Sequence, residues 1–256
     1  TELFARVQSK ALLGFGAANL AFYLAMAGVI DFSVQRGLQI GLDLILFVVT
    51  VMAGRVIPMF TDNAIPGTHA TRRAWLELTV LGSTLGLLAV DVLNLPPTAI
   101  AVIATIAGIA HAARLALWKP WVTARHPIVW ILHLSYAWIA VHLVLRALAA
   151  FDVVPATLAT HALTLGAIGG ITLGMMTRTS RGHTGRPLCA SPIETASYVL
   201  VHLAAAVRVF LPLAAPDLQL RLLVKPFDAF VVHELAALAQ LQVDHPNAVA
   251  PVPLRQ

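Results

Sequence analysis

The chain has 256 residues, of which 59% are hydrophobic and 11% are charged, and its mean hydropathy is +0.82. A soluble domain of this length does not need so much apolar sequence, so the composition excludes an ordinary soluble protein and predicts an all-α, polytopic transmembrane helical bundle. The net charge of +5 does not indicate nucleic-acid binding, because the cations lie in short segments between apolar runs, where membrane topology explains them.

The single cysteine, Cys189, limits the cofactor chemistry of the chain. One cysteine forms no disulfide within the chain and no Cys-based cluster or zinc site. The sequence also lacks a C-x-x-C-H motif, which excludes a covalently attached c-type haem.

Seven apolar stretches each approach the length of about 20 residues that crosses a bilayer as a helix. Two connections, 94–97 and 151–155, are short, so spans three and four, and spans five and six, are expected to form antiparallel hairpins. Together the spans predict a transmembrane bundle over residues 1–215, with the individual spans at 11–30, 38–57, 75–93, 98–118, 128–150, 157–177 and 192–214.

The two ends of the last span differ in character. At its start, Ser191-Pro192-Ile193-Glu194 predicts an N-cap serine, a first-turn proline and a glutamate that completes a capping box. After Ala215 the sequence becomes polar, and we predict a tail over 216–256, with an interfacial helix at 226–243 followed by disorder.

Arginine and lysine are distributed unevenly between the connections. They gather before span one and in the second, fourth and sixth connections, whereas the first, third and fifth connections hold only Arg36 between them. By the positive-inside rule, the Gly182–Arg186 loop is therefore predicted to be cytoplasmic.

Ionisable residues within the spans are costly in lipid, so each is a candidate for a site. Histidine predominates among them, and neutral imidazole is a common ligand of haem iron and copper, which favours metal binding over ion transport. The simpler alternative is that these histidines form hydrogen bonds between helices. The residues concerned are Asp43, Glu77, Asp91, His111, His133, His142, His161, His202 and Arg208.

Helical spacing sorts some of these residues. If span six is an α-helix, a stripe formed by Gly166, Gly170 and Gly174 allows close helix packing, while His161, Ile168 and Met175 lie on another face. His133 and Met175 lie at similar distances from the turn between spans five and six, so a His/Met pair is possible there. His133 and His142 are nine positions apart, on opposite sides of the helix, and cannot share one centre.

Several segments of the sequence together resemble the NnrS family, over about Leu3 to Leu213. The family consists of bacterial inner-membrane proteins described as containing haem and copper and linked to the response to nitric oxide and nitrosative stress, including in denitrification. Its sequences are longer, so we expect this chain to hold the later spans. The segments are Gly54 to Thr61, His126-Pro127 with Trp130, His133, Tyr136 and Trp138, His161 to Leu163, Gly174 to Arg178, and Gly182 to Leu188.

The resemblance implies non-covalent haem and copper as cofactors. Carried over residue by residue, it implies His133, His161 and His183 as metal ligands. Met175 is added because it lies about as far as His133 from the turn between spans five and six. It implies Arg55, Arg178 and Arg186 as the cations that hold haem propionates. The simpler alternatives are that Met175 packs between helices and that the arginines set topology and contact lipid headgroups.

The resulting expectation is a haem- and copper-binding inner-membrane protein that acts in resistance or response to nitric oxide, with nitric oxide as ligand. The sequence assigns no reaction; an enzymatic activity would be redox chemistry on nitric oxide or a nitrosyl complex. Two alternatives remain open: a transporter of a small solute, and a sensory membrane subunit without catalytic activity. The expected partners are the lipid bilayer and either a second copy of the chain or another subunit.

Overall fold

The structure, a computed structural model, describes Gly16 and residues 34–214. The tail at 216–256 and, apart from Gly16, the first predicted span at 11–30 lie outside the described residues. The chain divides into two compact units, Thr1–Val209 and Phe210–Gln256, and all contacts discussed below lie within the first.

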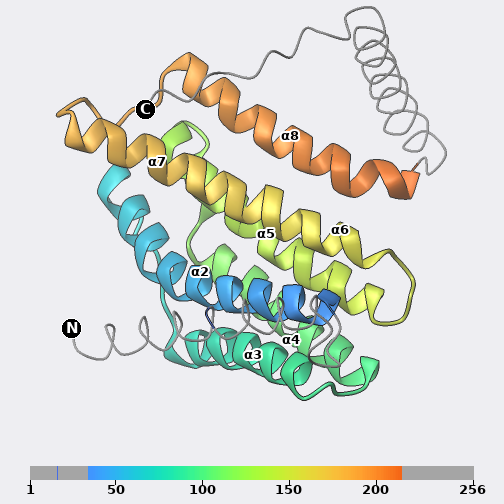
Figure 1. Cartoon of the computed structure of the whole chain (residues 1–256). Helices are drawn as coiled ribbons and strands as arrows, with labels where there is room; N and C mark the ends of the chain where they lie inside the picture. Colours follow the sequence, from blue (N-terminus) through green and yellow to red (C-terminus); the bar gives the residue numbers. More distant parts are fainter. Residues whose placement is uncertain (1–15, 17–33, 215–256) are drawn as a thin grey trace, which may run out of the picture. The chain divides into compact units, whose positions relative to one another are not determined.

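The described residues form helices and no strand (Figure 1). Six helical segments are long and apolar enough to cross a membrane, which confirms the prediction of an all-α, polytopic membrane protein. The elements are α2 (Val34–Ala64), α3 (Ala74–Val92), α4 (Pro97–Leu117), the 3₁₀-helix η1 (Pro120–Thr123), α5 (Pro127–Ala149), α6 (Ala156–His161), the π-helix η2 (Ala162–Gly169), α7 (Gly170–His183) and α8 (Pro192–Ala214).

Two helices extend beyond the predicted spans. Helix α2 continues to Ala64 rather than ending near residue 57, and α7 continues to His183 rather than ending near residue 177. Hydropathy detects only the part of a helix that matches hydrocarbon, whereas a helix continues into polar sequence until a residue stops it. In α7 that stop is Gly185, whose φ is +66°, so the first half of the predicted basic loop is helical.

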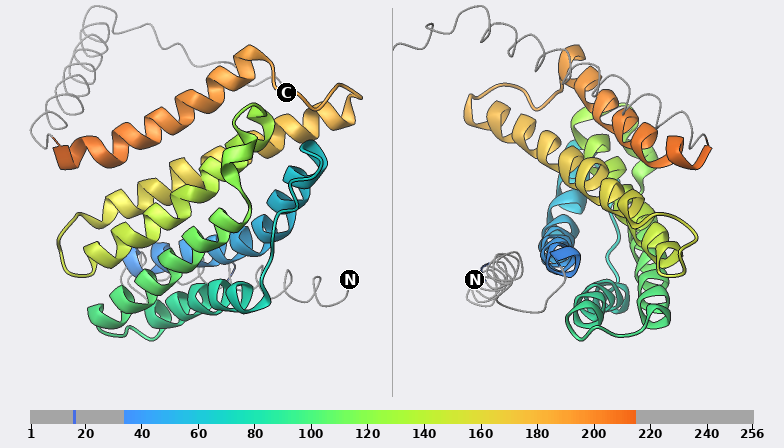
Figure 2. Two further views of the ribbon diagram at one scale, coloured as in Figure 1. Left: turned by 180° about the vertical axis from the view of Figure 1, so that it is seen from behind. Right: turned by 45° about the vertical axis from the view of Figure 1, so that its right-hand side comes forward.

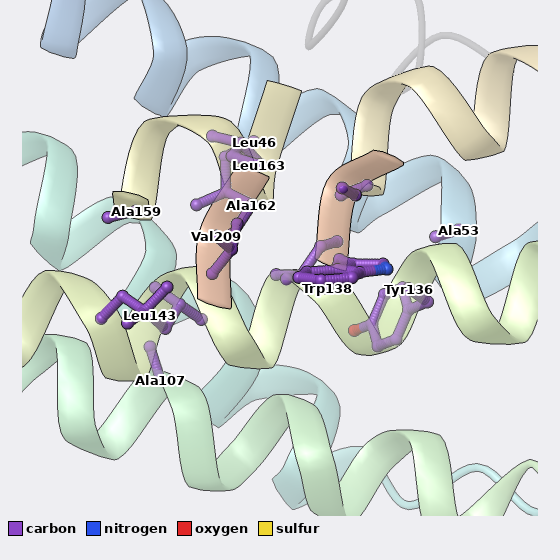
Figure 3. Packing of buried hydrophobic residues seen from close by; sticks show 14 of the residues in the cluster. Leu46, Ala53, Ala107, Tyr136, Trp138, Leu143, Ala159, Ala162, Leu163 and Val209 are labelled. Carbon is purple, nitrogen blue, oxygen red and sulfur yellow. The ribbon is translucent and has the colours of Figure 1, made fainter. Parts of the chain in front are cut away.

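Helix α5 is the centre of the bundle. It contacts α2, α4, α6, η2 and α7, and the views from front and back show it passing between α4 and the α6–α7 segment (Figures 1 and 2). A helix that is apolar on all sides is expected to be surrounded by protein or lipid, and α5 is buried around most of its circumference. Figure 3 shows Leu143 of α5 between Leu163 of η2 and Ala107 of α4.

The two predicted hairpins are confirmed. In α3 and α4, Thr84 lies against His111 and Gly86 against Ile103, so the paired positions run in opposite directions along the two helices. In α5 and α6, the Nδ1 atom of His142 lies 2.8 Å from the carbonyl oxygen of Ala159. Short connections leave no other arrangement for consecutive spans.

The predicted small-residue stripe is also confirmed. A methyl group on Gly166 would overlap Trp138, one on Gly170 would overlap Ser135, and one on Gly174 would lie 2.9 Å from a methyl group of Ile131. All three neighbours lie on α5. The glycines therefore let the η2–α7 segment approach α5 more closely than any larger residue would permit, as is typical of helix pairs in membranes.

The π-helix η2 corrects one prediction about span six. The spacing of seven that placed His161, Ile168 and Met175 on one face assumes an uninterrupted α-helix. A π-helical segment holds extra residues per turn, which shifts the phase between α6 and α7 by about one residue, or about 100°. Because η2 separates His161 from Met175, the two residues do not share a face.

The start of α8 has the predicted capping box. The backbone N–H of Ser191 donates to Oε2 of Glu194 at 2.6 Å, and the backbone N–H of Glu194 donates to the Ser191 hydroxyl at 3.3 Å. Arg181 of α7 donates to the same carboxylate through Nε and Nη2, at 3.0 and 2.6 Å. The loop between α7 and α8 is thus fixed by one glutamate that serves both helices.

Candidate metal centre among the buried histidines

Four histidines are almost completely buried in the bundle. His111, His133, His142 and His202 have exposed fractions of 0, 2, 1 and 7%. A neutral imidazole carries one N–H and one nitrogen lone pair, and the hydrogen-bond partners determine which of the two nitrogens carries the proton. The partners separate these histidines into two groups.

In the first group, both ring nitrogens of the histidine have partners. The Thr84 hydroxyl donates to the carbonyl of Val80 at 2.7 Å, so it accepts from Nε2–H of His111 at 3.4 Å. The Nδ1 lone pair of His111 then accepts from the Tyr136 hydroxyl at 2.8 Å. His111 is therefore a hydrogen-bonding residue between helices, as the simpler alternative predicted.

His202 of α8 belongs to the same group. The Ser135 hydroxyl donates to the carbonyl of Ile131 at 2.6 Å and faces Nε2–H of His202 at 3.5 Å. The indole N–H of Trp138 donates to Nδ1 of His202 at 3.1 Å. Neither nitrogen is left for another ligand, so His202 joins α8 to α5.

His133 of α5 belongs to the second group. The Thr61 hydroxyl donates to the carbonyl of Ile57 at 2.8 Å, so it accepts from Nε2–H of His133, also at 2.8 Å. This assignment places the lone pair on Nδ1, which is buried and has no hydrogen-bond partner among the described residues. An imidazole with one N–H held and the other nitrogen open has the form of a metal ligand.

His142 has the opposite tautomer. A carbonyl oxygen can only accept, so Nδ1 carries the proton that lies against Ala159, and Nε2 carries the lone pair. Nε2 is buried and also has no partner among the described residues. His142 and His133 face different neighbours, α6 and α2, which agrees with the predicted opposite orientation of the two side chains.

Arg178 of α7 packs against α2 at Phe60. Its guanidinium carbon is 3.7 Å from the centre of the Phe60 ring, and Phe60 directly precedes Thr61, the partner of His133. The Nη1 atom of Arg178 is buried and, in the described part of the chain, has no hydrogen-bond partner. Two adjacent residues of α2, Phe60 and Thr61, thus contact a guanidinium and an imidazole that each have one buried nitrogen without a partner among the described residues.

Two of the other predicted ligands lie far apart from each other. His161 and His183 lie at opposite ends of the span Ala156–His183, roughly 30 Å apart at the rise of an α-helix, so they do not share a centre. His161 is half-buried, with Nε2 3.4 Å from Nε of Arg208, and His183 is exposed. Met175 is partly buried and packs against the main hydrophobic core.

The two other predicted cations are exposed, Arg55 on α2 and Arg186 in the loop after α7. Within the residues that the structure describes, no three His, Cys, Asp or Glu side chains come together as a metal-binding group. Phe60 and Thr61 lie in one of the segments that resemble the NnrS family. Their roles could not be predicted, because nothing local in the sequence shows that they contact residues of α7 and α5.

The intramembrane carboxylates lie in two clusters with arginine. In the first, the Arg114 cluster, Arg114 of α4 forms an ion pair with Glu77 of α3. Its Nη1 also donates to the Thr50 carbonyl at 3.1 Å and to the Tyr136 hydroxyl at 3.2 Å. Gly54 of α2 allows this, because a methyl group there would overlap the guanidinium.

In the second, the Arg146 cluster, Arg146 of α5 forms ion pairs with Asp43 of α2 and with Asp91 of α3. Gln39 donates an amide N–H to Asp43 at 3.2 Å. Glu77 and Asp91 lie near opposite ends of α3, so the two clusters hold opposite ends of the bundle together.

Comparison with known sequences agrees with the resemblance noted above. The sequence model of the NnrS protein family matches residues 7–238, which is most of the chain. No curated protein and no solved structure matches the chain. The match extends through all the described helices and includes His133, Thr61 and Arg178. The chain is therefore a multi-pass membrane protein that belongs to the NnrS family, a family of the nitric oxide response.

Proposed function

We propose that this protein binds haem through His133 and Arg178 and that the haem takes part in resistance to nitric oxide. The observation that carries the proposal is the buried Nδ1 lone pair of His133, which has no hydrogen-bond partner among the described residues. Arg178, whose Nη1 likewise has no partner there, packs on the residue of α2 that precedes the partner of His133. The family itself supports only a general role in the nitric oxide response.

The residues fit the chemistry of haem. Nδ1 of His133 would be the axial ligand, because Thr61 already fixes the ring through Nε2. Arg178 would hold a propionate, since a guanidinium pairs strongly with carboxylate. When bound there, haem would supply the iron chemistry that binds nitric oxide. An apolar helical bundle would let this uncharged gas reach the site from the lipid.

Copper is the second cofactor that we propose, with His161, His183 and Met175 as the predicted ligands. Since His161 and His183 lie at opposite ends of one span, a single ion would use one of them together with groups from elsewhere. We also propose the bacterial inner membrane as the location, with the Gly182–Arg186 loop on the cytoplasmic side, because arginines gather near that loop.

The transporter alternative depended on intramembrane charges that would line a path. Asp43 and Glu77 instead belong to different clusters, and each forms an ion pair with an arginine. This pairing gives both carboxylates a role in holding helices together, and it favours the metal-binding proposal.

The test is an optical spectrum with metal analysis of the full-length protein purified in detergent. We expect a Soret band that shifts when nitric oxide is added. His133→Ala should abolish the band, because it removes the axial ligand. Arg178→Ala should retain the band after mild purification and lose haem faster on dilution, because it removes only the propionate partner.

Two matched controls accompany these variants. His126→Ala changes an exposed histidine that precedes α5 and should leave the band intact. His202→Ala changes a buried histidine whose nitrogens both have protein partners; it should lower thermal stability and retain haem. A protein without haem or copper, or a Soret band unchanged in His133→Ala, would overturn the proposal.

A further inference from the structure

The Arg146 cluster contains more negative than positive charge. Arg146 is 8% exposed, Asp43 is fully buried and Asp91 is 9% exposed. The Nη2 atom of Arg146 lies 3.3 Å from Oδ2 of Asp43 and also contacts Asp91, so one guanidinium serves both carboxyl groups. With both carboxyls ionised, the cluster would carry a net charge of −1.

No other described cation compensates this charge within the cluster. Gln39, the remaining polar contact of Asp43, is neutral. Arg36 lies two turns earlier on α2 and has an interaction of its own. On α4 the ionisable side chains, His111 and Arg114, belong to the Arg114 cluster. His142 lies one turn before Arg146 on the same face of α5.

An uncompensated charge is expensive in an apolar interior, and two carboxylates that share one site do not both ionise readily. We propose that Asp43 and Asp91 form a proton-binding site, in which Arg146 pairs with one carboxylate charge and the other carboxyl group holds a proton. The bound proton makes the cluster neutral, and it supplies a hydrogen-bond donor that two carboxylates alone would lack.

His142 is the ionisable group one turn before Arg146 on α5. It is 1% exposed, and its open Nε2 lone pair is a proton acceptor with no partner among the described residues. A charged imidazole is unfavourable at this position, because the ring is buried and because Arg146 lies one turn away.

Asp91 is the carboxyl of the pair through which we expect the proton to exchange with water. This residue is the second last of α3 and retains some exposure, whereas Asp43 has none. Release of the proton would leave two carboxylates facing each other between α2, α3 and α5. The packing of these three helices is thereby linked to protonation at one end of the bundle.

The experiment is infrared spectroscopy of the full-length protein in lipid nanodiscs, recorded in H₂O and D₂O at neutral pH. The wild type should show the C=O stretching band of a protonated carboxylic acid, and this band should shift in D₂O. Asp43→Asn and Asp91→Asn should each abolish the band. Asp91→Glu should keep a protonated group and shift the band instead, which identifies the residue even if the asparagine variants do not fold.

The matched control is Asp62→Asn, which changes an exposed carboxylate of α2 that accepts from the backbone N–H of Ala70 at 2.8 Å. It should leave the protonated band unchanged. A wild-type spectrum without the band would overturn the proposal directly, with no variant needed. A band that persists in both asparagine variants would assign the proton to another carboxyl and would equally refute it.

Discussion

In both the Arg114 cluster and the Arg146 cluster, a buried arginine joins helices by ion pairs, but the two clusters differ in the number of carboxyl groups. Arg114 pairs with one carboxylate and satisfies its remaining donors with neutral oxygens of Thr50 and Tyr136. Its guanidinium also lies 5.1 Å from the ring centre of Trp118. Arg146 faces two carboxyl groups instead. A buried arginine can thus form a neutral ion pair with one carboxylate, or it can face two carboxyl groups, in which case a bound proton is required for the cluster to be neutral.

The largest expected effect comes from removing each arginine. Arg146→Met leaves two carboxyls together in the interior, and breaking a buried pair in this way costs about 3–5 kcal/mol. Arg114→Met should cost less, because Glu77 is 18% exposed and can turn toward water. Thermal unfolding in detergent, followed by circular dichroism, measures both losses at neutral pH.

The comparison becomes sharper when Arg146→Met is combined with Asp43→Asn and Asp91→Asn. The triple variant should recover most of the lost stability, because no ionisable carboxyl remains in the cluster. Lowering the pH should also stabilise Arg146→Met, since protonation removes the two charges. Equal destabilisation of the Arg114 and Arg146 variants, with no rescue by acid, would show that the clusters do not differ in charge.

The next effect concerns the space around Arg114. Gly54→Ala places a methyl group where the guanidinium lies, and overpacking of this kind costs about 1–3 kcal/mol. Gly41→Ala is the matched control on the same helix, because a methyl group there meets nothing within 4 Å. The control should be neutral or stabilising by up to about 1 kcal/mol. Equal melting temperatures for the two variants would contradict the close approach of Gly54 and Arg114.

An effect of similar size is expected from Tyr136→Phe. The Tyr136 hydroxyl accepts from Arg114 and donates to Nδ1 of His111, so its removal leaves a buried lone pair without a donor. Such a loss costs about 1–3 kcal/mol. It should appear as a lower melting temperature with the haem content unchanged. A fall in haem content that exceeds the fall in folded protein would instead connect the Arg114 cluster to the proposed haem site.

The smallest effect should come from Gln39→Leu in the Arg146 cluster. The amide contributes one hydrogen bond to Asp43, worth about 0.5–1.5 kcal/mol. The loss of a neutral donor leaves the charge of the cluster unaltered, so the protonated-carboxyl band should remain and shift slightly. Disappearance of that band would mean that protonation of the carboxyl depends on the hydrogen bond from Gln39 rather than on the charge balance of the cluster.

Much of the fold could be predicted because it depends on local sequence. Apolar length gave the spans, the four residues from Ser191 gave the start of α8, and the stripe from Gly166 to Gly174 gave a contact face. Each of these signals lies within one element. The extension of α7 to His183 was missed because hydropathy does not register a helix that continues into polar sequence.

The candidate site could be predicted only in part, since it depends on contacts between distant positions. His133 was selected from the sequence, but its open nitrogen follows from Thr61, which lies 72 positions away. Arg146 meets Asp43 across 103 positions. No local pattern distinguishes His133 and His142, with open lone pairs, from His111 and His202, whose nitrogens are both engaged.

The π-helix η2 has a mechanical consequence for the span that contains it. The surplus residue in η2 separates the rotational setting of α6 from that of α7, so the span is not one rigid rod. If a single residue were deleted from η2, the segment could wind into an ordinary α-helix. Helix α7 would keep its glycine contacts with α5, while α6 would turn by about 100° and carry His161 to a new side of the bundle.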